Sequence, residues 1–234
     1  MRTGMTDQGT PLPWHRAAAA AIPMHSGLKS VGTTVFISAF FVAYFHLLRH
    51  PAHLPVVVPV IWLDRLVGFQ PLALPLYFSL WLYVSMLPAF FAIRSELYVY
   101  GAGMTAMCLA GLAVFYFLPN STPVPEIDWS QYPNIDFLKN IDAAGNACPS
   151  LHVATAFYSG AWIHRLLQRF GAPSWTHIFN WAWCTAIIYS TLAIRQHVAL
   201  DVVAGLALAA LAAWLSMRTR AAAARAVAPA GQHD

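Results

Sequence analysis

Long apolar runs separated by short polar stretches dominate the hydropathy pattern of this chain. Six runs cover residues 30–48, 73–93, 98–118, 151–169, 176–195 and 199–217. Each is long enough to cross about 30 Å of hydrocarbon as a helix. Because unpaired backbone groups are costly in lipid, a spanning run has to be helical or part of a closed barrel. The pattern predicts an all-α fold, a polytopic membrane helical bundle of six transmembrane helices.

Three other stretches do not fit a spanning helix. Residues 54–62 are apolar but short and interrupted by proline, which predicts a short re-entrant or interfacial segment. Residues 1–29 are mixed in character and are interpreted as a flexible cytoplasmic N-terminal arm. Residues 218–234 are interpreted as a cytoplasmic C-terminal tail, which leaves 30–217 as the six-span membrane domain.

Composition supports one membrane domain. The chain is 59% hydrophobic and 9% charged, whereas soluble domains carry about 45–50% apolar and about 25% charged residues. Its three cysteines form no CxxC pair, so neither a zinc site nor a disulfide framework is indicated. The net charge of +4 is scattered and does not indicate nucleic-acid binding.

The distribution of Lys and Arg predicts an orientation in the membrane. With six spans, both termini share a side with the turns at 94–97 and 170–175. That side carries nine of the thirteen Lys and Arg: Arg2, Arg16, Lys29, Arg94, Arg165, Arg169, Arg218, Arg220 and Arg225. The positive-inside rule places it in the cytoplasm. We expect an integral protein of a cell membrane, such as the bacterial inner membrane, with both termini cytoplasmic.

Two polar motifs lie at the outer ends of predicted spans. In the first, His197 and Asp201 are four residues apart, so a helix that starts near His197 places both on one face. A carboxylate that accepts from one ring nitrogen fixes the tautomer and leaves the other nitrogen free. The pair is a candidate nucleophile with its orienting acid. The alternative is a structural His–Asp pair that caps a helix start.

The second motif, Pro149-Ser150-Leu151-His152, is typical of a helix start. Ser150 is a candidate N-cap, and free amides at a helix N-terminus bind anions such as phosphate. His152 is a candidate acid for a departing alkoxide; the alternative is a capped helix with an interfacial histidine. Since an ionisable group in a membrane span is costly unless it has a function, the two motifs together predict a phosphoryl-transfer site.

The two motifs resemble the second and third signatures of the type 2 phosphatidic acid phosphatase superfamily. Those signatures read Pro-Ser-Gly-His and Ser-Arg-x5-His-x3-Asp, where this chain has Pro149-Ser150-Leu151-His152 and Ser190-Thr191-x5-His197-x3-Asp201. The resemblance implies that His197 attacks phosphorus, that Asp201 orients it and that His152 is the general acid. It also implies a covalent phosphohistidine intermediate and no metal or other cofactor.

The chain departs from these signatures where phosphate is bound. Thr191 replaces the arginine of the third signature, and the first signature, Lys-x6-Arg-Pro, has no match after the third span. Leu151 and the residues around His197 resemble the branch that contains inositolphosphorylceramide synthases, which transfers phospho-headgroups between lipids.

Charge on the transferring phosphoryl group still requires donors. Arg195 is the first candidate, and its alternative role is that of an interfacial anchor. Lys139 is the second candidate, and its alternative role is that of a solvated loop charge. Candidates for the remaining oxygens are Ser150, Ser190 and Thr191.

The sequence thus predicts a metal-independent membrane enzyme that acts on lipid-linked phosphate at the outer leaflet, on the periplasmic or extracellular side. Transfer to a lipid or polyol acceptor is slightly favoured over plain hydrolysis, and the substrate, a lipid phosphate or phospholipid, enters from the bilayer. Three other classes stay open: a transporter with a His/Asp cluster, a metal enzyme with His152, His197 and Asp201 as ligands, and a catalytically silent lipid-binding relative.

Overall fold

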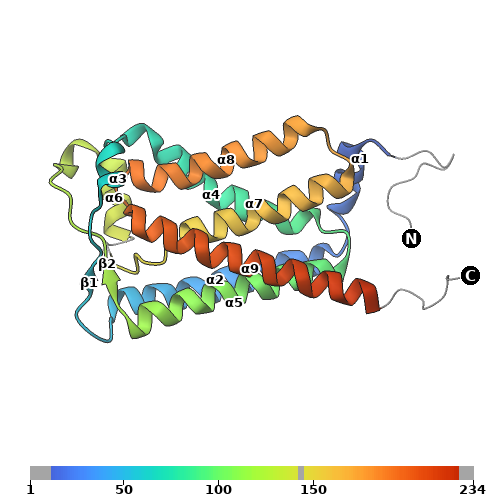
Figure 1. The fold of residues 1–234 in the computed structure, drawn as a ribbon, viewed down its shortest axis with the longest axis horizontal. Helices are drawn as coiled ribbons and strands as arrows, with labels where there is room; N and C mark the ends of the chain where they lie inside the picture. Colours follow the sequence, from blue (N-terminus) through green and yellow to red (C-terminus); the bar gives the residue numbers. More distant parts are fainter. Residues whose placement is uncertain (1–11, 142–144, 227–234) are drawn as a thin grey trace, which may run out of the picture.

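The computed structural model describes residues 12–141 and 145–226 and is an elongated bundle of helices that run along one axis (Figure 1). The long helices are α2 (Ser26–Arg49), α5 (Arg94–Phe117), α7 (Leu151–Phe170), α8 (Ser174–Ala193) and α9 (Ala199–Ala226). A sixth segment joins the 3-10 turn η1 (Pro71–Ala73), helix α4 (Leu74–Met86) and the 3-10 turn η2 (Leu87–Phe90). Helical segments therefore occupy all six runs that the hydropathy pattern singled out.

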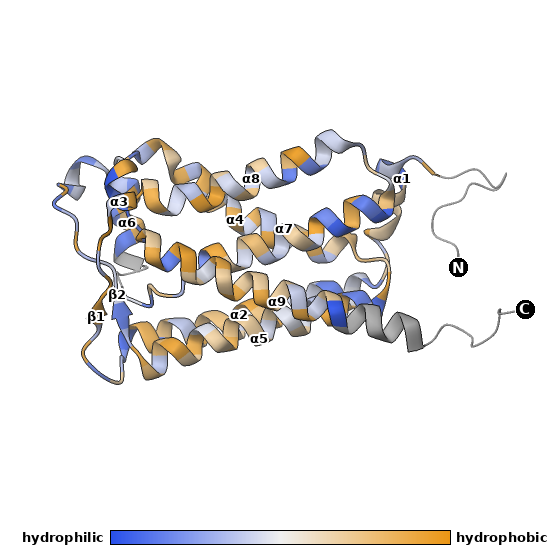
Figure 2. Cartoon of the chain, viewed as in Figure 1, coloured by the Kyte–Doolittle hydropathy of each residue, from blue (hydrophilic) through white to orange (hydrophobic). Residues whose placement is uncertain are grey.

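Four helical segments of the described chain are long and apolar enough to cross a membrane: Ser26–Arg49, Pro71–Phe90, Arg94–Phe117 and Ala199–Arg218. These helices indicate a membrane protein. α7 and α8 do not meet the same criterion, and α7 carries two histidines and two arginines along its length. Six spans therefore stays a prediction. Figure 2 shows apolar residues along the helices and hydrophilic residues gathered toward the two ends of the bundle.

Two prolines inside the second predicted span fall where helical segments begin. Pro75 lies in the first turn of α4, and Pro88 lies in the first turn of η2. A proline there removes only an amide that has no intrahelical partner, and its ring angle suits a helix start. The span is consequently built from three consecutive helical pieces rather than one uninterrupted helix.

The N-terminal stretch contains a helix that the sequence pattern did not predict. α1 (Trp14–Ala21) includes an alanine run of high helix propensity. Lys29 is buried and donates to the carbonyls of Ala21 (2.8 Å) and Ala89 (2.7 Å), which ties α1 to α2 and η2. The described part of the predicted arm is therefore folded against the bundle; residues 1–11 lie outside the described residues. At the other end, α9 continues to Ala226, past the predicted boundary at residue 217.

Short elements cover the end of the bundle opposite α1. Residues 54–62 contain strand β1 (Val56–Val57), which pairs in parallel with β2 (Asn120–Ser121), and α3 (Trp62–Leu66) follows. The 3-10 turn η3 (Trp129–Gln131) and α6 (Pro133–Ile141) complete this end. The two-residue strands are an addition to the predicted all-α fold, and residues 54–62 do not form a spanning helix.

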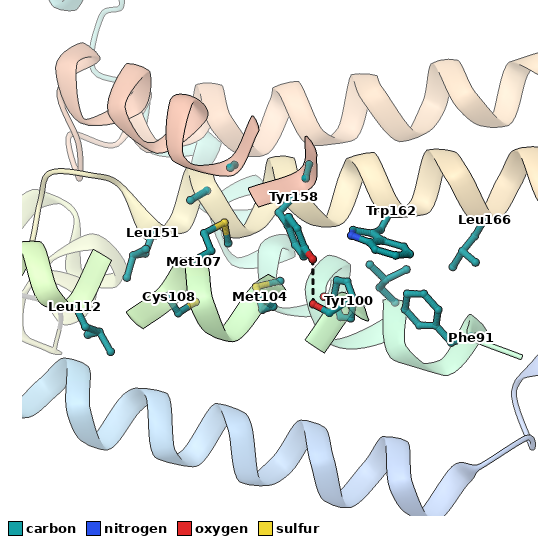
Figure 3. Close-up of a cluster of buried hydrophobic side chains, with 14 of the residues drawn as sticks. Phe91, Tyr100, Met104, Met107, Cys108, Leu112, Leu151, Tyr158, Trp162 and Leu166 are labelled. Atoms are coloured by element: carbon teal, nitrogen blue, oxygen red, sulfur yellow. Dashed lines mark hydrogen bonds between the residues drawn. The ribbon is translucent and has the colours of Figure 1, made fainter. Parts of the chain in front are cut away.

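The main hydrophobic core lies where α7 meets η2, α5 and α9. Figure 3 shows its side chains, among which Phe91, Tyr158 and Trp162 are fully buried. The Tyr158 hydroxyl donates to the Tyr100 carbonyl at 3.0 Å, so this buried polar group has a partner. Small residues along α7 let α8 and α9 approach it closely. α7 is therefore the central helix, and its first turn lies at the covered end.

Candidate active site

One cavity at the covered end of the bundle brings together the two histidines that the sequence analysis singled out. His152 in the first turn of α7 and His197 just before α9 both line it, and its volume is about 350 Å³. The start of α7 and the start of α9 lie at the same end of the molecule, opposite α1 and the C-terminal end of α9 (Figure 1). The structure therefore joins two motifs that are separated along the chain.

His197 and Asp201 lie together as expected, although α9 begins at Ala199, so His197 precedes the helix instead of lying on its face. The distance from His197 Nδ1 to Asp201 Oδ2 is 3.4 Å, which is at the long end for a hydrogen bond. Asp201 is fully buried, and its Oδ2 also accepts from the amide of Val198 at 3.0 Å. The carboxylate thus faces Nδ1, which leaves Nε2 of His197 as the free ring nitrogen.

The turn between α8 and α9 sets the position of His197. Arg195 adopts the left-handed region at φ +59°, an uncommon conformation for a residue with a side chain. This reverses the chain so that the amides of Gln196 and His197 both donate to the carbonyl of Thr191, at 3.0 and 3.1 Å. Thr191 therefore positions His197 through a hydrogen bond to its backbone carbonyl.

The hydroxyls of Ser190 and Thr191 point back to their own helix. Ser190 Oγ donates to the Ile187 carbonyl at 2.6 Å, and Thr191 Oγ1 donates to the Ile188 carbonyl at 2.8 Å. Both residues are fully buried, and neither lines the cavity that holds the two histidines.

Ser150 is the N-cap of α7, as predicted. Its Oγ accepts from the Val153 amide at 3.2 Å, and its own amide donates to the Asp201 carbonyl at 3.0 Å. Gly205 on α9 lies against the same residue: a Cβ at this position would be 2.5 Å from the Ser150 carbonyl oxygen. This close approach, which only glycine permits, holds the start of α7 next to the His197–Asp201 pair.

The ring of His152 stacks on Tyr77 of α4, with centroids 4.0 Å apart and an interplanar angle of 18°. Its Nε2 is buried and has no hydrogen-bond partner among the described residues. A buried nitrogen of this kind is an available donor or acceptor for a ligand in the cavity. Tyr77 carries no signal in the sequence, because it lies in an apolar run where an aromatic residue is ordinary packing.

The side chain of Asn120 bonds the loop before α7 at several backbone groups. Its Oδ1 accepts from the amides of Ala147 (2.9 Å) and Cys148 (2.7 Å), and its Nδ2 donates to the Cys148 carbonyl at 2.7 Å. Burial, together with the nearby Asp201 carboxylate, raises the pKa of the Cys148 thiol. Cys148 is therefore a neutral thiol at physiological pH rather than a reactive thiolate.

The sequence profile of the PAP2 superfamily matches residues 95–225, more than half of the chain. The chain belongs to the PAP2 superfamily. No curated protein and no solved structure matches it significantly. Members of this superfamily are phosphatases, so membership indicates a phosphatase-type activity on lipid phosphate. The match runs from α5 to α9 and contains Ser150, His152, His197 and Asp201, while α2 and α4 lie outside it.

In this PAP2 protein both candidate cations bond backbone carbonyls near the turn that carries His197. Lys139 Nζ donates to the Arg195 carbonyl at 3.0 Å and lies 4.6 Å from the centre of the Trp129 ring. Arg195 in turn donates from its guanidinium to the Asp64 carbonyl at 3.1 Å. Neither cation lines the cavity. In the described chain, no group of three or more His, Cys, Asp and Glu side chains is arranged to hold a metal ion.

Asp64 is a site residue that the sequence analysis missed. Its side chain is buried, and its Oδ1 accepts from the Ala199 amide at 2.6 Å, midway between His197 and Asp201 in the chain. Its Oδ2 accepts from the Ile61 amide at 2.8 Å, which caps α3. The carboxylate thereby fastens the start of α9 to the covering segment. No local pattern relates residues 64 and 199, so the sequence offered no signal for this contact.

Asp64→Asn is expected to lower kcat by about 10- to 100-fold, because the amide group repels one of the two backbone donors and displaces the turn that carries His197. Loss of a buried charge-assisted hydrogen bond also lowers the free energy of unfolding by about 1–3 kcal/mol. The measurements are kcat, KM and thermal unfolding in detergent.

Asp128→Asn is the matched control, because Asp128 is exposed and its side chain bonds Ser130 and Gln131 in its own loop. A wild-type kcat in Asp64→Asn would show that Asp64 does not position the site.

Proposed function

We propose that this PAP2 protein is an integral membrane lipid phosphatase or phosphotransferase that acts on lipid-linked phosphate at the outer leaflet. The observation that carries the proposal is a cavity that holds both histidines at one end and has a predominantly apolar lining elsewhere. Such a cavity is complementary to an amphiphile that carries a phosphate group. Its opening among membrane helices suits a substrate that enters from the bilayer rather than from water.

The geometry supports a two-step reaction. In the first step Nε2 of His197 attacks phosphorus and forms a phosphohistidine, while the bond between phosphorus and the lipid oxygen breaks and His152 protonates that oxygen. The Asp201 carboxylate holds the Nδ1 proton and stabilises the positive charge on the ring. In the second step water or an acceptor hydroxyl gives a proton to His152 and attacks phosphorus, which releases His197.

Phosphate oxygens require donors in both steps. We assign this role first to the amides at the start of α7, next to the N-cap Ser150. Arg195 and Lys139 are the charged candidates, and each would exchange a backbone carbonyl for a phosphate oxygen. Ser190 and Thr191 are weaker candidates, because their hydroxyls already bond helical carbonyls in the buried interior of the bundle.

Transfer to a lipid or polyol hydroxyl is slightly favoured over hydrolysis. The reasons are the resemblance of Leu151 and the residues around His197 to the inositolphosphorylceramide synthase-like branch, and the replacement of the signature arginine by Thr191. The bundle end that holds Arg16, Arg94, Arg165, Arg169 and Arg218 is proposed to face the cytoplasm, which puts the cavity on the opposite side of the membrane.

The test is incubation of the purified protein with labelled lipid phosphates and phospholipids, with and without candidate acceptors. Release of inorganic phosphate indicates hydrolysis, and a new labelled lipid that requires the acceptor indicates transfer. Both products are expected to be independent of chelators. Binding of these lipids without turnover of any of them would refute the enzyme and favour a lipid-binding or transport protein.

A further inference from the structure

We propose that the apolar part of the active-site cavity binds one hydrocarbon chain of the substrate between α2 and α4, so that single-chain lipid phosphates are the preferred substrates. The inference rests on the proposed function and extends it by naming a chain-binding site. It is carried by the lining of the cavity beyond the two histidines.

Aromatic side chains from two helices form the walls of this region, which we call the chain cleft. They are Phe36, Phe40, Phe41 and Phe45 on α2 and Phe78 and Trp81 on α4. These flat, apolar faces have few hydrogen-bonding groups, so burial of methylene groups against them is favourable. Both helices lie outside the matched superfamily region.

The chain cleft runs along the helices and away from the histidines. Tyr77 stacks on His152 near the start of α4, and Ser85 lines the same cavity eight residues later, about 12 Å further along the helix. α2 runs in the opposite sense, so Phe45 lies near the site and Phe36 lies deeper. A lipid with its phosphate at His152 and His197 would therefore extend its chain toward the middle of the bundle.

The dimensions of the cavity favour one chain. Its volume of about 350 Å³ includes the space beside the histidines and lies at the low end of the range for small-molecule pockets, about 300–1,000 Å³. α2 packs along α5 rather than along α4, and the rings of Phe41 and Trp81 bridge the gap with centroids 5.2 Å apart. This contact narrows the space between the two helices, and together with the small volume it favours one chain over two.

The experiment compares three phosphate monoesters with the full-length protein in detergent: a water-soluble short-chain alkyl phosphate, lysophosphatidate with one long chain, and phosphatidate with two. Wild-type kcat/KM is expected to be highest for lysophosphatidate. Ser85 is exposed and lines the end of the chain cleft farthest from the histidines. Ser85→Trp adds a large side chain at that end and is expected to lower the ratio of long-chain to short-chain kcat/KM by about tenfold or more, equivalent to about two buried methylene groups.

Two further variants make the result specific. Val42→Trp adds the same side chain to an exposed position of α2 outside the cleft, and its ratio is expected to match the wild type. Phe41→Ala removes the bridge and is expected to reduce the discrimination against phosphatidate.

Equal effects of Ser85→Trp on short and long substrates, or equal wild-type rates on one-chain and two-chain lipids, would overturn the chain cleft while leaving the proposed function intact. No turnover of any of the three esters by the wild type would overturn the proposed function and the chain cleft with it.

Discussion

His197→Ala is expected to abolish turnover of every lipid phosphate and to prevent formation of the phosphoenzyme. Removing the nucleophile of a catalytic unit typically lowers kcat by on the order of 10⁴- to 10⁶-fold. The expectation depends on the position of His197, which lines the cavity and presents Nε2 while Asp201 faces Nδ1. The measurements are steady-state turnover and acid-labile incorporation of labelled phosphate into the protein.

His50→Ala is the matched control for this experiment. His50 is exposed, directly follows the last residue of α2, and interacts with His46 in that helix. Its removal is expected to leave turnover and labelling at wild-type levels. If His197→Ala retained wild-type turnover or still trapped labelled phosphate, a different nucleophile would operate and the phosphohistidine mechanism would be wrong.

Loss of His152 is expected to have an effect that depends on the leaving group. For lipid phosphates, whose alkoxide departs poorly without a proton, His152→Gln should lower kcat by about 10²- to 10⁴-fold. For an aryl phosphate with an acidic phenol the loss should be far smaller, because that leaving group departs without protonation. The measurement is kcat/KM over a series of esters with graded leaving-group pKa values.

Glutamine is chosen at position 152 because it retains polar volume against Tyr77 but has no acidic proton to transfer. His152→Ala provides a second variant, and thermal unfolding of both separates a folding defect from a catalytic one. A uniform loss across the ester series would indicate that His152 binds phosphate rather than protonates the leaving oxygen.

Several features of the fold were predictable because they depend on residues near each other in the chain. Helical segments occupy all six long apolar runs, since hydropathy and length are local properties. The N-cap role of Ser150 and the pairing of His197 with Asp201 follow from spacings of a few residues. The helix α1 and the strand pair β1–β2 were missed, because a short helix and a two-residue strand leave little periodicity in the sequence.

The sequence by itself determined which segments are apolar helices, which residues begin α7 and α9, and which histidine has a carboxylate partner. Only the tertiary structure brought His152 and His197 into one cavity, placed Asp64 on the amide of Ala199 and stacked Tyr77 on His152. It also directed Arg195 and Lys139 to backbone carbonyls and opened the space between α2 and α4. The physical reason is that hydropathy and capping act over a few residues, whereas these contacts join distant segments whose meeting depends on how all the helices pack together.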